Sequence, residues 1–457
     1  MNLPLHTSLS RRSALAHMGI GLGGIAIDTL LADKPPPQKG PHFRPRAKQV
    51  ILIFSSGGVS QLDLFDPKPE LVKRHGEFPP DHLLKGERFA FINPKSKLMG
   101  SPWAFQPHGQ SGMEFSELLP HLSTLADKST IVRSVKTDNV NHTPAQILMG
   151  TGFEQPGRPS MGSWIVYGLG SENQDLPAFV DLYSNKAKTR TPLKSAGFLP
   201  GIHQAVSLRP GKDPIHFINN PEGMTSEDRR ATIDAINQLN QHRHDLLGNP
   251  EIITRIKQYE MAFRMQSAVP ELLDISGESE ATLNGYGAER DQPSLARNML
   301  LARRLVERGV RFVQLRDGGW DHHGEIKKKL AASCQNLDRP LAALINDLDQ
   351  RGLLSETLVV WTSEFGRTPQ AQGSGRDHHK HAFSVWMAGG GLKPGYVHGT
   401  TDELGYHVAE DPVHVHDLQA TILELLGFDH RQLTYQHAGR DHRLTDVKGF
   451  VIDQLIG

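Results

Sequence analysis

Histidines in the C-terminal third are the residues whose type and spacing point most directly to chemistry. The chain has 457 residues and 24 His, and twelve of the His lie between His322 and His442. Seven of the twelve stand in three groups, which are His322 and His323; His378, His379 and His381; and His414 and His416. Imidazole nitrogens combine with carboxylates to hold divalent metal ions. The grouping therefore predicts a metal site.

The first group follows two glycines, Gly318 and Gly319, whose flexible backbone favours a tight turn. Asp321 and His323 stand two positions apart, so that one carboxylate oxygen and one imidazole nitrogen can hold the same Zn²⁺ or Mn²⁺. The structural alternative is a helix N-cap at Asp321 beside a solvated His323. We favour Asp321 and His323 as metal ligands.

The second group lies in residues 375–381, which contain three His, one Asp and two cations. A site for a metal ion and an anion needs both kinds of group. We predict Asp377 and His378 as ligands, with orientation of a neighbouring His as the alternative role of Asp377.

The third group lies in residues 413–417, which alternate like a short strand and place His414 and His416 on one face. Either His can be a ligand, and we predict His416.

Glu364 and Arg367 end a strand that is otherwise apolar. Glu364 offers a metal ligand or a base, and Arg367 offers a bidentate clamp for a tetrahedral oxyanion. A salt bridge between the two is the structural alternative.

A possible nucleophile stands in the segment Asn141-His142-Thr143-Pro144. A metal ion that lowers the pKa of the Thr143 hydroxyl would make it a nucleophile, and Asn141 can donate to the developing charge. We place His142, between them, in the same catalytic group. Thr143 and Pro144 also suit the N-cap and first position of a helix, whose N-terminus favours an anion.

Short β-branched runs alternate with longer helical patterns, which predicts an α/β fold with a doubly wound, mostly parallel sheet flanked by helices. Strands are expected at 49–55, 129–135, 178–183, 310–316, 357–363 and 382–388, and helices at 116–127, 227–247, 251–266, 294–308, 325–350 and 417–426. The strands are nearly continuous apolar runs, so both faces of the sheet should be covered. Polar groups follow four of these strands and should gather at the carboxyl edge of the sheet.

The N-terminus predicts an export signal. Arg11 and Arg12 precede a weakly apolar, glycine-rich stretch, 18–31, as in signals read by the twin-arginine export machinery. The stretch is too short for a membrane span and contains Asp28. An amphipathic helix of a cytoplasmic protein is the alternative. We expect a signal over 1–33, a Pro-rich linker over 34–45, and one domain over 46–457 with an insertion around 185–290.

The net charge and the cysteine content argue against some classes of partner and of covalent cross-link. The 50 Lys and Arg balance the 50 Asp and Glu, which argues against a nucleic-acid partner. Cys334 is the only cysteine, so the chain has no internal disulfide, in agreement with export of a chain that has already folded in a reducing cytoplasm.

Four ordered motifs carry a family resemblance. They are LIFSSGGVSQLDLFDPKP at 52–69, GWDHHG at 319–324, SEFGRTP at 363–369 and GRD at 439–441. From about residue 45 to its C-terminus the chain resembles the domain-of-unknown-function 1501 family of exported bacterial proteins. That family is similar in fold to the alkaline phosphatase and sulfatase superfamily, and the resemblance implies a two-metal hydrolase. Residues 416–427 resemble the C-terminal helix motif of sulfatases, and residues 143–152 resemble the region after their nucleophile.

The chain also departs from the superfamily pattern. Residues 142–146 lack the Cys and the Arg of the formylglycine motif, so that mechanism is not expected. The Asp that normally follows the first strand is replaced by Ser55-Ser56-Gly57-Gly58, and Asp63 or Asp66 would have to substitute. The usual Asp-His pair is replaced by Glu364-Phe365. One metal site is therefore incomplete, rebuilt from Asp377 and His378, or lost.

These observations lead to two hypotheses. The first is an exported metal-dependent hydrolase of sulfate or phosphate esters, either small molecules or polysaccharides. One or two ions of Zn, Mn, Ca or Mg would activate Thr143 or a water. The second is a non-catalytic protein on the same alkaline phosphatase-like fold that binds anionic glycans. The missing Asp supports the second hypothesis, and the polar clusters at the strand ends argue against it.

Overall fold

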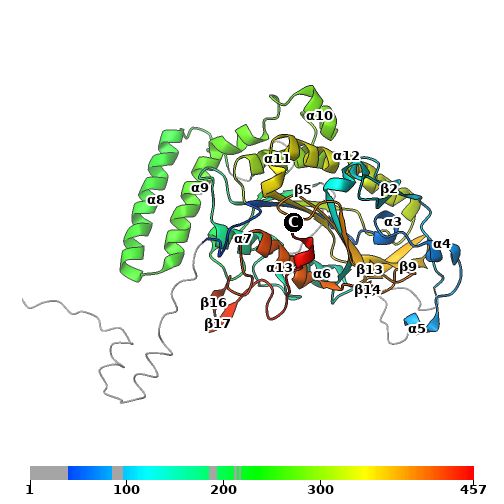
Figure 1. Ribbon diagram of the computed structural model, residues 1–457. Coiled ribbons are helices and arrows are strands. Elements are labelled where there is room, and N and C mark those ends of the chain that lie inside the picture. The colour runs from blue at the N-terminus through cyan, green and yellow to red at the C-terminus, as the bar shows by residue number, and fades with distance from the viewer. Residues whose placement is uncertain (1–39, 85–95, 185–192, 210–213, 216–217) are drawn as a thin grey trace, which may run out of the picture. The chain divides into compact units, whose positions relative to one another are not determined.

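The computed structural model describes residues 40–84, 96–184, 193–209, 214–215 and 218–457 (Figure 1). The export signal expected over 1–33 and half of the linker expected over 34–45 therefore lie outside the described residues, as do short parts of the 185–290 insertion.

A nine-stranded, mostly parallel sheet forms the centre of the domain. Strand β1 (Gln49–Ser56) pairs in parallel with β7 (Phe312–Gly318) on one side and with β8 (Thr357–Thr362) on the other. The order is β12-β4-β11-β8-β1-β7-β5-β6, and β15 also pairs with β4. The remaining bounds are β4 Ser129–Lys136, β5 Phe179–Tyr183, β6 Val206–Leu208, β11 Phe383–Ala388, β12 Tyr396–His398 and β15 Val413–His414.

The strand directions bring four carboxyl ends to one edge of the sheet. Strand β11 is antiparallel to both of its neighbours, β8 and β4, so β4 runs in the same direction as β8. The carboxyl ends of β1, β4, β7 and β8 therefore share an edge, where open α/β sheets bind their ligands. The predicted α/β fold with a mostly parallel sheet is confirmed.

Both faces of the sheet are covered. Along β1, Ile51 and Ile53 join one buried apolar cluster, and Val50, Leu52 and Phe54 join the other. Helices α11 (Leu295–Glu307) and α12 (Ile326–Gln350) contribute to the first cluster, and α6 (His142–Thr151), α7 (Met161–Leu169) and α13 (Val415–Leu425) to the second. Figure 1 shows these two sets on opposite sides of the sheet. This two-sided burial explains why the strands are apolar throughout.

The predicted elements agree with the structure at most positions. All six expected strands are present, with ends shifted by at most two residues. The expected helices over 227–247 and 251–266 form a hairpin of α8 (Ser226–Leu247) and α9 (Pro250–Leu273). The helix expected over 116–127 is wrong, because strand β3 (Met113–Ser116) ends there and a 3₁₀-helix, η1, covers Leu122–Lys128. The buried carboxylate of Asp338 accepts the backbone N–H groups of His121 and Leu122 and thereby fixes where η1 begins.

Short hairpins and short helices make up the rest of the described structure. A two-stranded hairpin, β9 (Gly366–Gln372) and β10 (Gly375–His379), follows β8 and carries much of the predicted chemistry. The other elements are α3 Gln61–Leu64, α4 Pro69–Lys73, α5 Asp81–Leu84, β2 Phe105–His108, η2 Gly201–His203, α10 Glu280–Tyr286, η3 Leu354–Glu356, β13 Thr400–Thr401, β14 Val408–Glu410, β16 Tyr435–His437, β17 Arg440–His442 and η4 Asp453–Leu455. Among the helices described, none has the length and apolar character that a membrane crossing requires.

Candidate metal centre

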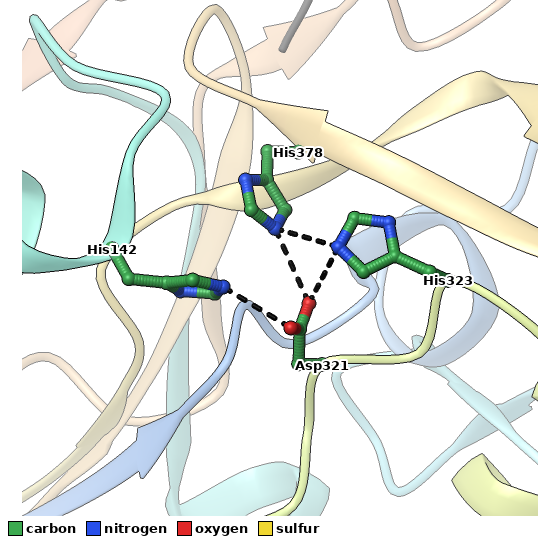
Figure 2. Close-up of side chains that lie close together, drawn as sticks. All are labelled: His142, Asp321, His323 and His378. Atoms are coloured by element: carbon green, nitrogen blue, oxygen red, sulfur yellow. Dashed lines mark hydrogen bonds and ion pairs between the residues drawn. The ribbon is translucent and has the colours of Figure 1, made fainter. Parts of the chain in front are cut away.

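Four side chains meet at the carboxyl edge of the sheet. His142 is the first residue of α6, Asp321 and His323 lie in the loop after β7, and His378 belongs to β10. One nitrogen or oxygen atom from each lies within 4.8 Å of the corresponding atom of every other. Figure 2 shows the three rings around the Asp321 carboxylate. In the part of the chain that the structure describes, no second group of His, Cys, Asp or Glu is gathered in this way.

The atoms at the centre are close enough to be ligands of one ion. The Nε2 atoms of His323 and His378 are 2.9 Å apart, and they lie 2.9 and 3.2 Å from Oδ1 of Asp321. Nε2 of His142 lies 3.3 Å from Oδ2 of Asp321. Donors bound to one Zn²⁺ at about 2.0–2.1 Å in a tetrahedron are about 3.3 Å apart. The observed separations fit that arrangement.

The outer nitrogen of each ring faces an oxygen atom. Nδ1 of His142 lies 2.7 Å from Oε1 of Glu364, and Nδ1 of His378 lies 2.7 Å from the carbonyl oxygen of Val140. Nδ1 of His323 contacts the side-chain oxygen of Gln372. Because these oxygens accept hydrogen bonds, each Nδ1 can carry the proton of a neutral ring and leave the lone pair of Nε2 for a bound ion. Metal-binding histidines are oriented in this way by outer hydrogen bonds.

The formal charges around the centre also suit a divalent cation. With the three histidines neutral, as metal ligands are, Asp321, Glu364 and Asp377 contribute three negative charges and Arg367 one positive charge, so that 1 − 3 leaves a net charge of −2. Glu364, Asp377 and Arg367 are fully buried, where an uncompensated charge is costly. The residues present therefore fit a bound divalent ion.

The environments of the three histidines shift their pKa values in different directions. Burial lowers the pKa of His142, but hydrogen bonds to Asp321 and Glu364 outweigh it and raise the pKa to about 9. The hydrogen bond to Asp321 raises the pKa of His323, whereas burial lowers that of His378. Burial acts to raise the pKa of Asp321, but hydrogen bonds from the three rings hold it well below its usual range. Asp321 is therefore ionised at neutral pH and contributes a negative charge at the centre.

A family model described as "Protein of unknown function (DUF1501)" matches residues 47–456. The chain belongs to this family. The match confirms the resemblance that the four motifs indicated. No curated protein matches the sequence of this DUF1501 protein.

Solved structures similar to the DUF1501 protein come from the alkaline phosphatase and sulfatase superfamily. A protein of the alkaline phosphatase superfamily from Vibrio parahaemolyticus is 11% identical, with a TM-score of 0.35 over 86% of this chain and 70% of that one. A sulfatase from Pseudoalteromonas sp. is 11% identical, with a TM-score of 0.36 over 91% and 71% of the two chains. A phosphonate monoester hydrolase from Silicibacter pomeroyi is 11% identical, with a TM-score of 0.33 over 83% and 73%.

Glu364 and Asp377, both predicted as ligands, lie behind the four central groups of the DUF1501 protein. Glu364 accepts the N–H of Gly57, a side-chain N–H of Gln146 and the ring N–H of His142. Asp377 accepts the backbone N–H of His378 and lies 3.9 Å from Nδ1 of His323. Glu364 therefore orients the ring of His142, and Asp377 lies beside two candidate ligands, next to which the sequence left it the alternative role of orienting a histidine.

Arg367 does not lie where a substrate clamp would. Its side chain is fully buried, and its nitrogens donate to the backbone oxygens of Gly58 and Arg376 at 2.9 and 3.0 Å and also to that of Gly57. The nitrogen that donates to Gly57, Nη2, also donates to Oδ1 of Asp321 at 2.6 Å. The guanidinium therefore holds Asp321 against the backbone after β1, and each of its three nitrogens already donates within the protein.

Two further predicted ligands lie in other contacts. Asp63 forms a fully buried ion pair with Arg376, with 2.8 Å between Oδ2 and Nε. Nε2 of His416 lies 2.9 Å from the carbonyl oxygen of Gly152, and its ring stacks on His414. Neither belongs to the four-residue group.

The predicted nucleophile lies beside the centre. Thr143 is exposed in the first turn of α6, immediately after His142. The helix N-cap is Asn141 and not Thr143, and its side chain makes no capping hydrogen bond. His142, which was grouped with the catalytic residues, lies instead among the candidate ligands.

Sequence reasoning missed the uncharged partners of the centre. Gln372 and Gln146 make side-chain contacts with His323 and Glu364, and Val140 contributes only a backbone carbonyl. In a single sequence, a Gln in a helix or a strand does not by itself indicate a site, and every residue has a carbonyl group. Their roles therefore needed the folded structure.

Proposed function

We propose that this DUF1501 protein is an exported, metal-dependent hydrolase of phosphate or sulfate esters. The observation that carries the proposal is the set of three Nε2 atoms turned towards one carboxylate at the carboxyl edge of the sheet. The centre is open on one side, because the side chains of Asp321 and His142 are 45% and 32% exposed while that of His378 is 2% exposed. An ester can therefore reach it from solvent.

The donor set favours some metal ions over others. Three imidazole nitrogens and one carboxylate suit Zn²⁺ or Mn²⁺, whereas Ca²⁺ and Mg²⁺ prefer oxygen ligands. His142, Asp321, His323 and His378 would hold a single ion. When bound, the ion would supply a Lewis acid that polarises the ester and favours ionisation of the attacking hydroxyl or water.

The N-terminus of α6 would help to hold the anionic ester. Its first backbone N–H groups, those of His142 and Thr143, have no helical carbonyl to bind, and Asn141 leaves them uncapped. A helix N-terminus favours a phosphate or sulfate group. The hydroxyl of Thr143 or a water would attack the phosphorus or sulfur atom, the bond to the alcohol would break, and the departing alcohol would take up the proton that the attacking group loses. If Thr143 attacks, a water would then release the phosphate or sulfate from its oxygen.

Metal content and hydrolysis test the proposal together. Full-length protein is stripped with a chelator, loaded with Zn²⁺ or Mn²⁺, and assayed on 4-nitrophenyl phosphate and 4-nitrophenyl sulfate. We expect about one tightly bound ion per chain and hydrolysis of at least one ester, both lost in His323→Ala. The matched control is His437→Ala, an exposed histidine on β16. Loaded protein that is inert on both esters, or a His323→Ala variant with unchanged turnover, would contradict the proposal.

Two variants of Thr143 identify the attacking group. If its hydroxyl is the nucleophile, Thr143→Ala abolishes turnover and Thr143→Ser retains part of it. If Thr143→Ala turns over at the wild-type rate, water attacks directly. Metal content, measured in both variants, shows whether His142 next to it is undisturbed.

Export is tested by cell fractionation. In a bacterium with a twin-arginine pathway, we expect the wild-type chain outside the cytoplasm and an Arg11→Lys, Arg12→Lys variant inside it. Equal distribution of the two chains would contradict export by this route.

A further inference from the structure

A cavity lies at the edge of the sheet opposite to the metal centre. It has a volume of about 440 Å³ and includes Ala178 and Ala205, which directly precede β5 and β6. The cavity is therefore at the amino ends of these strands, whereas the metal centre is at the carboxyl ends. Its other wall comes from α8 and α9, the hairpin beside the sheet in Figure 1. Ligand cavities are typically about 300–1,000 Å³.

The lining of the cavity is mainly apolar. Val166 comes from α7, Val206 from β6, and Met261 and Met265 from α9. Methionine side chains are unbranched and adapt to ligands of irregular shape. These walls suit an apolar body, and the proposed ester hydrolysis makes no use of them.

One cation that lines the cavity, Arg229, has no counter-ion among the described residues. Nε of Arg229 is buried and has no hydrogen-bond partner, and the structure records no ion pair for this residue within the described ranges. The next residue, Arg230, is paired with Asp234 and Glu260. Four other arginines also have a buried nitrogen without a hydrogen bond, but each is in an ion pair through its guanidinium: Arg133, Arg158, Arg303 and Arg311.

We propose that this cavity binds a small amphipathic monoanion, namely an apolar chain that ends in a carboxylate. A guanidinium presents a planar fork of donors that matches a carboxylate. Arg229 would bind the carboxylate, and the walls from α7, β6 and α9 would cover the chain. Because one wall belongs to the α8–α9 hairpin and the other to the sheet, the ligand would also fasten the hairpin to the domain.

Isothermal titration with fatty acids tests the inference on the full-length protein. Octanoate, decanoate and dodecanoate are used below their micelle concentrations, and methyl decanoate is the uncharged counterpart. We expect one site per chain, with affinity rising about fourfold for each added CH₂ until the cavity is filled. Decanoate should bind at least about tenfold more tightly than its methyl ester, because a hydrogen bond to a charged group is lost in the ester.

Three variants separate the cavity from the rest of the surface. Arg229→Gln should weaken decanoate at least about tenfold, and Met261→Trp should fill the cavity and abolish binding. Arg243→Gln, an exposed position on the same helix, should bind as wild type. Metal content should be unchanged in all three, which separates this inference from the proposed hydrolysis. No saturable binding to the wild type, equal affinity for the acid and its methyl ester, or full affinity in a folded Arg229→Gln variant would overturn the inference.

Discussion

Glu364 shows how a residue that touches no ester can control the centre. Its buried carboxylate receives hydrogen bonds from Gly57, Gln146 and His142, so it joins the ends of β1 and β8 to the first turn of α6. The contact with His142 keeps the proton on Nδ1 and leaves Nε2 for the metal ion.

Replacing Glu364 with Gln should weaken metal binding without removing a ligand. The amide cannot accept both the N–H of Gly57 and that of His142 as a carboxylate does, and loss of such an outer partner typically costs about 10–100-fold in affinity. Competition with a chromophoric chelator measures the change. The control is Glu356→Gln, at a half-exposed glutamate paired with Lys48, which should keep wild-type affinity. Equal affinity in the two variants would contradict the role given to Glu364.

The variant Arg367→Lys tests whether Arg367 stabilises the fold or binds the substrate. Lys has three donors on one atom and cannot reach the carbonyls of Gly57, Gly58 and Arg376 together with Asp321. We expect a loss of about 1–3 kcal/mol in the free energy of unfolding, as when buried carbonyl groups are left without their hydrogen-bond donor. Urea unfolding measures it, with exposed Arg243→Lys as the control. Wild-type stability combined with lost hydrolysis would instead assign Arg367 to the substrate.

At the scale of elements, the centre depends on a close approach of the loops that follow β1 and β7. Gly57 has φ +128°, and a Cβ atom there would lie 2.4 Å from the backbone N of Asp321 and 2.7 Å from the backbone C of Trp320. Only a residue without a side chain allows the loop that carries Asp321 to pack against the end of β1.

Gly57→Ala should therefore separate the two loops. The strained φ and the clash with backbone together should cost about 3 kcal/mol or more in stability and lower the metal content. The matched control is Gly324→Ala, in the same loop, where a Cβ would meet only Oγ of Ser374 at 3.7 Å. Thermal unfolding and metal analysis of both variants give the result. A Gly57→Ala protein that keeps its metal and its stability would show that the loops can separate without loss.

The positions of helices and strands could be predicted well where buried apolar residues follow a regular pattern along the chain. The strands of the sheet are apolar on both faces, and α11 and α12 have apolar stripes, so their positions could be inferred from residue types alone. The hairpin of β9 and β10 was missed because its buried residues are polar. Arg376 and His378 lie inside the protein through an ion pair with Asp63 and contacts at the metal centre.

The contacts of buried polar residues were also hard to predict at the candidate site. Asp321 and His323 were predicted because they follow a strand that ends at this edge, and His378 because three histidines gather in 375–381. His416 was predicted from the alternation of 413–417, and Asp63 as a substitute for the Asp that the superfamily places after its first strand, yet they contact the carbonyl of Gly152 and Arg376. Which polar group faces which depends on contacts between residues hundreds of positions apart, and those contacts follow from the packing of the whole chain.

At the scale of the whole molecule, the abundance of histidine makes stability depend on pH. Burial lowers the pKa of seven described histidines: His322, His378, His379, His398, His416, His430 and His442. The pKa is raised in two, His142 and His323. A histidine with a lowered folded pKa contributes stability that is complete above the unfolded pKa of about 6.5 and is lost as the pH falls below it.

Acidification from pH 6.5 to 5.5 should therefore destabilise the protein, and His430 offers a direct test. Its ring is buried and lies 2.8 Å from the hydroxyl of Thr445. Burial lowers the pKa of His430, so the unfolded chain takes up a proton at a higher pH than the folded protein does. Each such group contributes up to about 1.4 kcal/mol per pH unit. His142 is protonated in the folded state throughout this range and at least half protonated in the unfolded state, so it opposes the slope only weakly. The measurement is urea unfolding of both proteins with a chelator present. The free energy of unfolding should depend less steeply on pH for His430→Gln than for wild type. Identical slopes would mean that His430 is protonated in the folded protein.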